Sequence, residues 1–261
     1  MKKHLLLFSV LAIGATILNS CSKTTNGSQG PQGPAGPAYT GTLSGHVDLY
    51  DQYGSQILNS KSARVVLYNS SNAVIDSVNA DSTGAYSFTK ISTGIYTLAF
   101  RDTGYGQQLH QNFQFLGGGD LNVDGKISRI PNFNITGVTI DSINHASGNV
   151  ILTCSVNADT KTRTLLIFAS GSTSVSSNPA NYLAVIAQTI KANATSVVIQ
   201  FPLNTLYNAG LTSSSTAYFA IYGATANYST ASSYEDYTTG RTIYASLTAT
   251  DFSPAPTSVL P

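Results

Sequence analysis

Residues 80–105 read ADSTGAYSFTKISTGIYTLAFRDTGY, and this stretch predicts two β-strands that meet at a glycine. Asp81 and Gly84 are typical of a tight turn, because Asp caps nearby backbone N–H groups and Gly tolerates a left-handed backbone. Gly94 reverses the chain, so we expect the second strand to return beside the first. Large apolar residues alternate along both strands and are predicted to face one core: Tyr86, Phe88, Ile91, Tyr96, Leu98 and Phe100.

The same alternation extends outward over residues 39–132, which we predict to form one β-sandwich. Gly, Asn, Asp and Ser interrupt the alternating stretches at the intervals expected of a sandwich, and no stretch has sustained helical periodicity. The predicted strands cover residues 42–50, 63–69, 73–80, 85–91, 95–102 and 108–116.

The stretch from Asp81 to Tyr105 resembles the carboxypeptidase regulatory-like family, which has a transthyretin-type β-sandwich. The family pattern is D-x-x-G-x-Y-x-F, an apolar residue, G-x-Y-x-L and then G-Y. The matching residues are Asp81, Gly84, Tyr86, Phe88, Ile91, Gly94, Tyr96, Leu98, Gly104 and Tyr105. The resemblance implies a structural or binding module, since the regulatory-like domain carries no catalytic residue.

Residues 133–252 are predicted to form a second β-sandwich, followed by a tail at residues 253–261. The expected strands cover residues 133–143, 149–156, 163–170, 182–190, 195–201, 216–224 and 242–249. Their order resembles a fibronectin type III or immunoglobulin-like sandwich. The chain has no Trp, which excludes a true antibody-type domain. The predicted fold class is therefore all-β, with two tandem β-sandwich domains.

The amino terminus has the features of a secretory signal peptide. Lys2 and Lys3 precede an apolar stretch from Leu5 to Leu18, which is too short to span a bilayer as an ordinary helix of roughly 20 residues. Cys21 stands where cleavage is expected, and the run before it resembles the lipobox of bacterial lipoproteins. The resemblance implies that residues 1–20 are removed and that Cys21 carries a lipid. The alternative is an ordinary signal peptide with an incidental cysteine.

Residues 21–38 are predicted to be a lipidated leader and spacer. Gly27, Gly30, Gly33 and Gly36 recur every third residue, and proline follows the last three of them, as in collagen. So few triplets favour an extended polyproline-II spacer over a stable triple helix. The whole arrangement resembles small collagen-like and carboxypeptidase regulatory-like lipoproteins of Gram-negative bacteria. That resemblance implies no particular activity.

The composition excludes several classes of function. Charged residues make up only 10% of the chain, so no basic surface for nucleic acid is expected. The chain has a single glutamate, Glu235, and no recognisable hydrolase, zinc-protease or P-loop motif, so we predict a protein that is not an enzyme and has no catalytic residue. Cys154 lies among alternating apolar residues and is predicted to be a core residue without a disulfide partner.

One segment has the opening pattern of a calcium loop, D-x-N-x-D-G. Its candidate metal ligands are Asp120, Asn122 and Asp124, and Gly125 would allow the turn. Position twelve of the pattern, where a bidentate acid belongs, is Pro131. The alternative interpretation is an Asx-rich turn between the domains, and we favour it. No other cofactor is predicted.

A long loop in the second sandwich is the candidate recognition surface. If the strands run as in fibronectin type III modules, loops 157–162, 192–194 and 225–240 share one end. The candidate ligand-binding residues in the last loop are Tyr228, Tyr234, Glu235, Asp236 and Tyr237. Tyrosine offers an apolar ring with a hydroxyl, which suits a protein or glycan ligand. The alternative is that this loop packs against the first domain.

These features predict a non-catalytic lipoprotein of the cell envelope, tethered to the outer membrane through Cys21. We expect an adhesion or ligand-binding module at the cell surface. Two alternatives stay open: a surface glycan-binding protein that assists polysaccharide uptake, and a structural lipoprotein that faces the periplasm.

Overall fold

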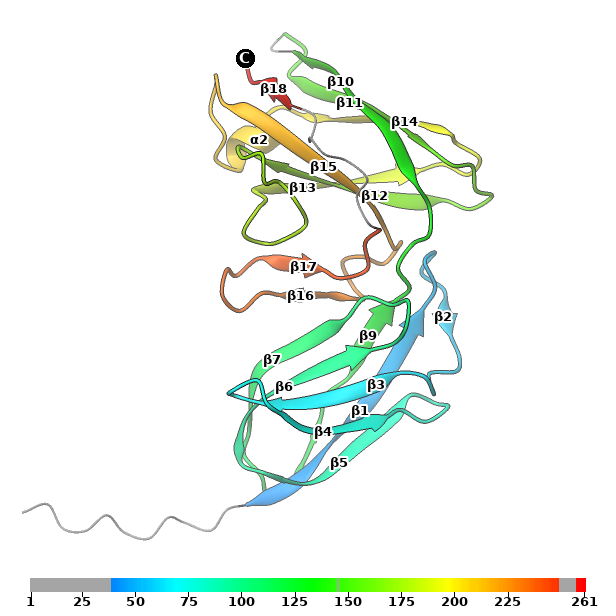
Figure 1. The fold of residues 1–261 in the computed structure, drawn as a ribbon, viewed down its shortest axis with the longest axis vertical. Helices are drawn as coiled ribbons and strands as arrows, with labels where there is room; N and C mark the ends of the chain where they lie inside the picture. The colour runs from blue at the N-terminus through cyan, green and yellow to red at the C-terminus, as the bar shows by residue number, and fades with distance from the viewer. Residues whose placement is uncertain (1–38, 145, 249–256) are drawn as a thin grey trace, which may run out of the picture. The chain divides into compact units, whose positions relative to one another are not determined.

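The computed structural model describes residues 39–144, 146–248 and 257–261, and strands account for nearly all of its regular structure (Figure 1). The all-β prediction is confirmed. The signal peptide, Cys21 and the collagen-like spacer lie outside the described residues. No helix among the described residues is long and apolar enough to cross a bilayer.

The first sandwich consists of two sheets. In one sheet β1 is central: β2 and β5 pair with it in antiparallel fashion, and β8 and β9 in parallel. These strands are β1 (Thr40–Tyr50), β2 (Gln56–Ile57), β5 (Ala85–Ser92), β8 (Asp120–Asn122) and β9 (Gly125–Ser128). The other sheet has the order β4-β3-β6-β7, formed by β3 (Arg64–Asn69), β4 (Val74–Asn79), β6 (Gly94–Arg101) and β7 (Gln108–Phe115).

The core of this sandwich lies between the two sheets. Its fully buried side chains include Leu43, Leu49, Leu67, Phe88, Leu98, Phe100 and Ile127. β9 lies so close to this core that a Cβ on Gly125 would be 2.4 Å from Cγ of Phe100. Gly125 is therefore required by the close approach of the strand to a buried ring.

The stretch 80–105 forms the predicted turn but pairs differently from the prediction. Asp81 O accepts the Gly84 N–H at 3.1 Å, Gly84 has φ of +93°, and the alternating apolar residues are buried. However, β5 pairs with β1, whereas β6 pairs with β3 and β7, so the expected hairpin is wrong. At Gly94 the chain passes from one sheet to the other. Both arrangements place the same side chains in the core, so alternation alone does not distinguish them.

Residues 120–128, which we interpreted as a turn between domains, form the short strands β8 and β9. Both lie parallel to β1, with Leu43 opposite Leu121 and Leu49 opposite Ile127. The expected turn is therefore wrong. Asp, Asn and Gly are poor strand formers, and here tertiary pairing with a long central strand outweighs that preference.

The second sandwich also consists of two sheets. One has the order β10-β11-β14, and the other β13-β12-β15-β18. The strands are β10 (Ile135–Asn144), β11 (Asn149–Val156), β12 (Arg163–Ser170), β13 (Ala184–Ile190), β14 (Ser196–Pro202), β15 (Thr216–Ala224) and β18 (Thr257–Val259); a short helix, α2, covers Asn204–Asn208. Cys154 is fully buried in the core, as predicted, and desolvation raises the pKa of its thiol to about 11.

The last strand of the second sandwich is not the predicted one. We expected residues 242–249 to complete the sheet and residues 253–261 to be a tail. Instead β18 pairs with the start of β15, and Leu260 is buried. β17 (Thr242–Tyr244) forms a separate hairpin with β16 (Ser233–Glu235). Of the predicted strand at residues 242–249, the structure forms Thr242–Tyr244, and the alternation does not specify its partner.

Candidate functional site

The three loops predicted to share one end of the second sandwich do so. The Asn193 N–H donates to Asp159 O at 2.6 Å, which joins loops 192–194 and 157–162. Thr164, near the start of β12, lies opposite Ala224 at the end of β15. The long loop after β15 therefore leaves from the same end, and it carries the β16–β17 hairpin.

The base of this loop is fixed to the first sandwich. The Ala226 N–H donates to Gln52 O at 3.1 Å, and the Ser232 N–H to Lys126 O at 2.8 Å. The Ser246 hydroxyl donates to Ser128 O at 2.8 Å. The alternative interpretation of the loop, packing against the first domain, is thus what the structure shows at its base.

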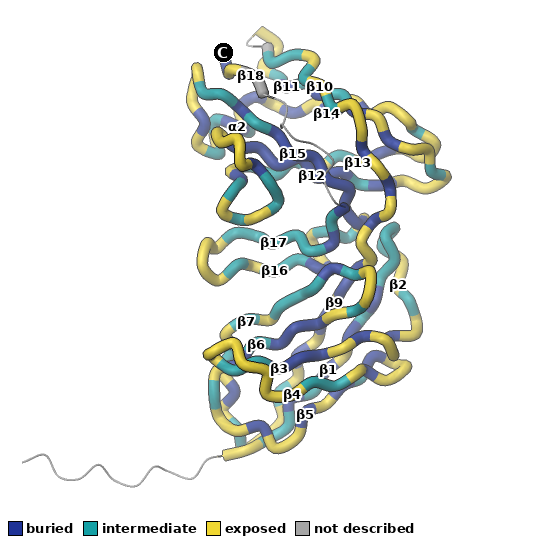
Figure 2. Tube along the Cα trace, viewed as in Figure 1, coloured by how far each residue is buried: buried dark blue, intermediate teal, exposed yellow. Residues whose placement is uncertain are grey.

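The hairpin also covers the outer face of the β12–β15 sheet. The Tyr244 ring packs edge-on against Phe168 with centroids 5.8 Å apart. The Tyr182 hydroxyl donates to Thr242 O at 2.6 Å, and Arg241 Nη1 donates to Pro179 O at 3.2 Å. Figure 2 shows buried and half-buried residues along this hairpin, in contrast to its exposed tip. Contacts on both sides hold the hairpin in one position.

Between β7 and β16 lies a groove of about 520 Å³, which we call the β7–β16 groove. Its lining residues are Gln108, Leu109, His110, Gln111, Tyr234, Glu235 and Tyr237. Three of the five predicted ligand-binding residues, Tyr234, Glu235 and Tyr237, therefore share one surface. The Tyr237 side chain is 75% exposed, so most of its surface is available to a ligand.

The amide side chains of the groove have fixed orientations. The Oε1 atom of Gln108 accepts the Lys126 N–H at 2.6 Å, and that of Gln111 accepts the Tyr237 N–H at 3.2 Å. Because each carbonyl oxygen is used, each NH₂ group is left as a donor. The Glu235 carboxylate makes no hydrogen bond or ion pair with a described residue and remains an acceptor.

Desolvation sets the charge state of two groove residues. It lowers the pKa of His110, which favours a neutral imidazole at pH 7. Desolvation, with a smaller effect of the Asp236 charge, raises the pKa of Tyr234 and keeps its hydroxyl protonated. The groove thus offers one carboxylate among neutral donors, acceptors and rings.

Two predicted ligand-binding residues do not line the groove. Tyr228 packs against Tyr244, with ring centroids 6.1 Å apart. Asp236 Oδ2 accepts the Thr239 hydroxyl and N–H, at 2.5 and 3.0 Å, and the hydroxyl contact is the main reason why the pKa of Asp236 is lowered. These two residues shape the hairpin. The β7 residues of the groove escaped prediction, although the polar run from Gln107 to Gln111 is a local signal for them.

The calcium-ligand candidates lie on β8 and just after it. Asp124 Oδ1 accepts the His46 N–H at 2.9 Å and the Asn122 Nδ2 amide at 3.2 Å. This carboxylate therefore binds a backbone N–H in the middle of β1. Among the described residues, no three His, Cys, Asp or Glu side chains come together as a metal site. The calcium site at Asp120, Asn122 and Asp124 stays a prediction.

Comparison with known proteins gives distant structural similarities only. No family model and no curated protein matches the chain. The chain is similar to a solved candidate carbohydrate binding protein from Bacteroides uniformis, with 16% identity over 85% of this chain and 100% of that chain and a TM-score of 0.31. It is also similar to a DUF3823 family protein from Parabacteroides merdae, with 16% identity, 85% and 99% coverage and a TM-score of 0.28. A DUF3823 family protein from Bacteroides ovatus has 15% identity, 86% and 100% coverage and a TM-score of 0.29.

Proposed function

We propose that this chain is a non-catalytic binding module of the cell envelope that binds a glycan in the β7–β16 groove. The observation that carries the proposal is the convergence of Tyr237, Glu235 and two oriented amides on one open surface of about 520 Å³. This volume lies within the range of about 300–1,000 Å³ typical of small-ligand sites.

The groove chemistry suits sugar hydroxyls. Each hydroxyl both donates and accepts, so it can donate to the Glu235 carboxylate and accept from the NH₂ groups of Gln108 and Gln111. The exposed Tyr237 ring offers an apolar surface for the C–H face of a sugar. Because the amides are already oriented by backbone contacts, less conformational entropy is lost on binding.

The same groove supports the non-catalytic interpretation. Glycoside hydrolases generally use a pair of carboxyl groups about 5–10 Å apart across the scissile bond. Glu235 is the acidic residue of the groove lining, and the adjacent Asp236 is engaged by Thr239 within the hairpin turn. We therefore assign the groove to recognition.

Attachment to the outer membrane through Cys21 belongs to the same proposal. A lipid anchor followed by a Gly/Pro spacer would hold the sandwiches away from the membrane and raise the local concentration of a bound glycan there. We propose that the module faces the cell exterior. Protease shaving of intact cells tests this orientation: loss of the sandwiches supports it, and protection, with digestion in a lysed control, contradicts it.

Glycan binding is tested by titrating the full-length chain, in detergent, with neutral xylo-, cello-, malto- and manno-oligosaccharides. The chain has 15 Tyr and no Trp, so its intrinsic fluorescence comes from tyrosine, with Tyr234 and Tyr237 of the groove among the emitters. We expect saturable quenching by at least one series. An aromatic contact of about 1.4 kcal/mol corresponds to about tenfold in Kd, and Tyr237→Ala should weaken binding by that factor.

The matched control is Tyr39→Ala, which removes another largely exposed tyrosine, 60% exposed, directly before β1. This variant should bind like the parent chain. The proposal is contradicted if no series quenches the fluorescence, or if Tyr237→Ala and Tyr39→Ala bind equally well.

A further inference from the structure

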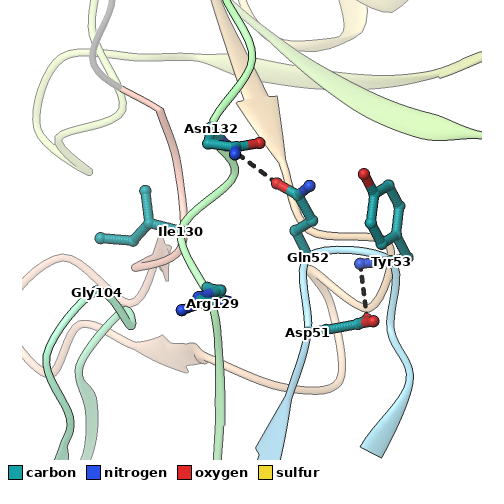
Figure 3. Close-up of a pocket in the computed structure, with 7 residues that line it drawn as sticks. All are labelled: Asp51, Gln52, Tyr53, Gly104, Arg129, Ile130 and Asn132. Carbon is teal, nitrogen blue, oxygen red and sulfur yellow. Dashed lines mark hydrogen bonds between the residues drawn. The ribbon is translucent and has the colours of Figure 1, made fainter. Parts of the chain in front are cut away.

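A second cavity, of about 650 Å³, lies where the chain leaves the first sandwich (Figure 3). We call it the junction pocket. Its lining residues are Asp51, Gln52, Tyr53, Gly104, Arg129, Ile130 and Asn132. They come from the β1–β2 loop, the loop before β7 and the segment that follows β9. None of them lines the β7–β16 groove.

Most polar groups of the junction pocket already have protein partners. Asp51 Oδ1 accepts the N–H groups of Tyr53 and Ser55 at 2.9 and 2.8 Å. Gln52 Oε1 accepts the Asn132 N–H at 3.0 Å, as Figure 3 shows. These contacts fix the β1–β2 loop as one wall of the cavity.

Tyr53 is held by the second sandwich. Its hydroxyl donates to Asp159 Oδ2 at 2.7 Å, and Lys161 Nζ lies 4.4 Å from the centre of its ring. The hydrogen bond to Asp159 is the main reason why the pKa of Tyr53 is raised. The Asp159 carboxylate in turn accepts the Lys161 N–H at 2.9 Å. Asp51, in this wall, and Asp159, behind it, therefore both already accept hydrogen bonds from the protein.

Arg129 differs from these residues: within the described part of the chain its guanidinium acts only through its charge, which lowers the pKa of Tyr105 against the larger effect of desolvation. Its backbone N–H donates to Tyr50 O at 2.9 Å, which fixes the start of the side chain, and the residue is exposed. The guanidinium makes no hydrogen bond or ion pair with a described residue. Arginine has five N–H donors in a planar arrangement that matches a carboxylate. The cavity therefore has an unused donor group on Arg129, and the Asp51 carboxylate in the same lining is engaged through Oδ1 by two backbone N–H groups.

We propose that the junction pocket binds a carboxylate-bearing saccharide, that is, a hexuronate unit. Arg129 pairs with the carboxylate through two parallel hydrogen bonds. The Asn132 side-chain amide donates to and accepts from ring hydroxyls, and Ile130 contacts the apolar face of the ring. This site is separate from the β7–β16 groove, so each can fail without the other.

The experiment is calorimetric titration of the full-length chain, in detergent, with tri-galacturonate and with the uncharged galactose trimer. We expect tri-galacturonate to bind and the uncharged trimer to bind at least about tenfold more weakly, since charge-assisted bidentate contacts are about twice as strong as neutral ones. Arg129→Gln should weaken tri-galacturonate binding by at least about tenfold, and Arg129→Lys by less, because lysine keeps the charge and loses the planar geometry.

A control separates this site from other surfaces. Arg101→Gln removes an exposed arginine that contacts Tyr68 and does not line the pocket, and it should leave tri-galacturonate binding unchanged. Equal binding by Arg129→Gln and the parent chain would overturn the proposal. So would equal binding of the charged and uncharged trimers, or preferential binding of a peptide through its terminal carboxylate.

Discussion

Gly125→Ala should destabilise the first sandwich although it adds only one methyl group. The new Cβ would lie 2.4, 2.5 and 2.7 Å from Cγ, Cδ1 and Cδ2 of Phe100. Ordinary contacts between carbon atoms are about 3.5–4.0 Å, so the ring or the strand has to move by about 1 Å. Phe100 is fully buried and also packs against Tyr86, with ring centroids 5.9 Å apart, so it cannot move freely.

The expected loss of stability is about 1–3 kcal/mol, the usual cost of overpacking a close-packed core. At about 2 kcal/mol, Tm falls by about 4–8 °C in a protein of this size. Urea unfolding followed by tyrosine fluorescence measures the change. The control is Gly119→Ala, where an added Cβ meets nothing within 4 Å, so stability should stay within about 0.5 kcal/mol of the parent.

A second variant tests the stated cause. Phe100→Ala removes the Cγ, Cδ1 and Cδ2 atoms that the new Cβ would contact, so Gly125→Ala should cost clearly less in the Phe100→Ala background than in the parent. A coupling energy of at least about 0.5 kcal/mol is expected for residues in contact. If the two costs are simply additive, or if Gly125→Ala is neutral, the assigned clash is refuted.

Three further predictions concern other parts of the chain. Cys154 has a folded pKa of about 11 against an ordinary value of 9.0, so its contribution to stability is complete below pH 9 and is lost between pH 9 and 11. The Cys154→Ala variant should therefore lose less stability than the parent over this range, and urea unfolding at a series of pH values measures the difference. Tyr182→Phe removes the hydrogen bond to Thr242 O and should lower the free energy of unfolding by about 1 kcal/mol. Tyr218→Phe, at a half-buried tyrosine with no such bond among the described residues, should be near neutral. A similar cost for both variants in urea titrations would contradict the role of the bond. Cys21→Ala should move the protein from the membrane to the soluble fraction, and retention in the membrane fraction would exclude the lipid anchor.

The sequence predicts strands and their inward faces well, because burial imposes a period of two wherever one face meets a core. Tyr86 and Phe88 on β5, and Leu98 and Phe100 on β6, follow this rule and are buried. Alternation does not specify which strands pair. β5 and β6 therefore belong to different sheets, although they were expected to form a hairpin.

Short strands are the second limit of prediction. β8 and β18 have three residues each, too few to show a period, and they exist because β1 and β15 have free edges to pair with. The candidate groove was predicted only on the β16 side. Gln108 and Gln111 lie more than a hundred residues earlier in the chain, and only the packing of the hairpin against β7 brings the two segments together.

The two walls of the β7–β16 groove come from distant parts of the chain, and this limits how evolution can change the groove. One wall is encoded by residues 108–111 and the other by residues 234–237. Neither sandwich carries the whole groove, so shuffling single domains between genes cannot transfer it. Point substitutions in β7 and in the hairpin tip remain the route by which the groove lining can change, while the contacts of Tyr182 and Ser246 at the hairpin base must be kept.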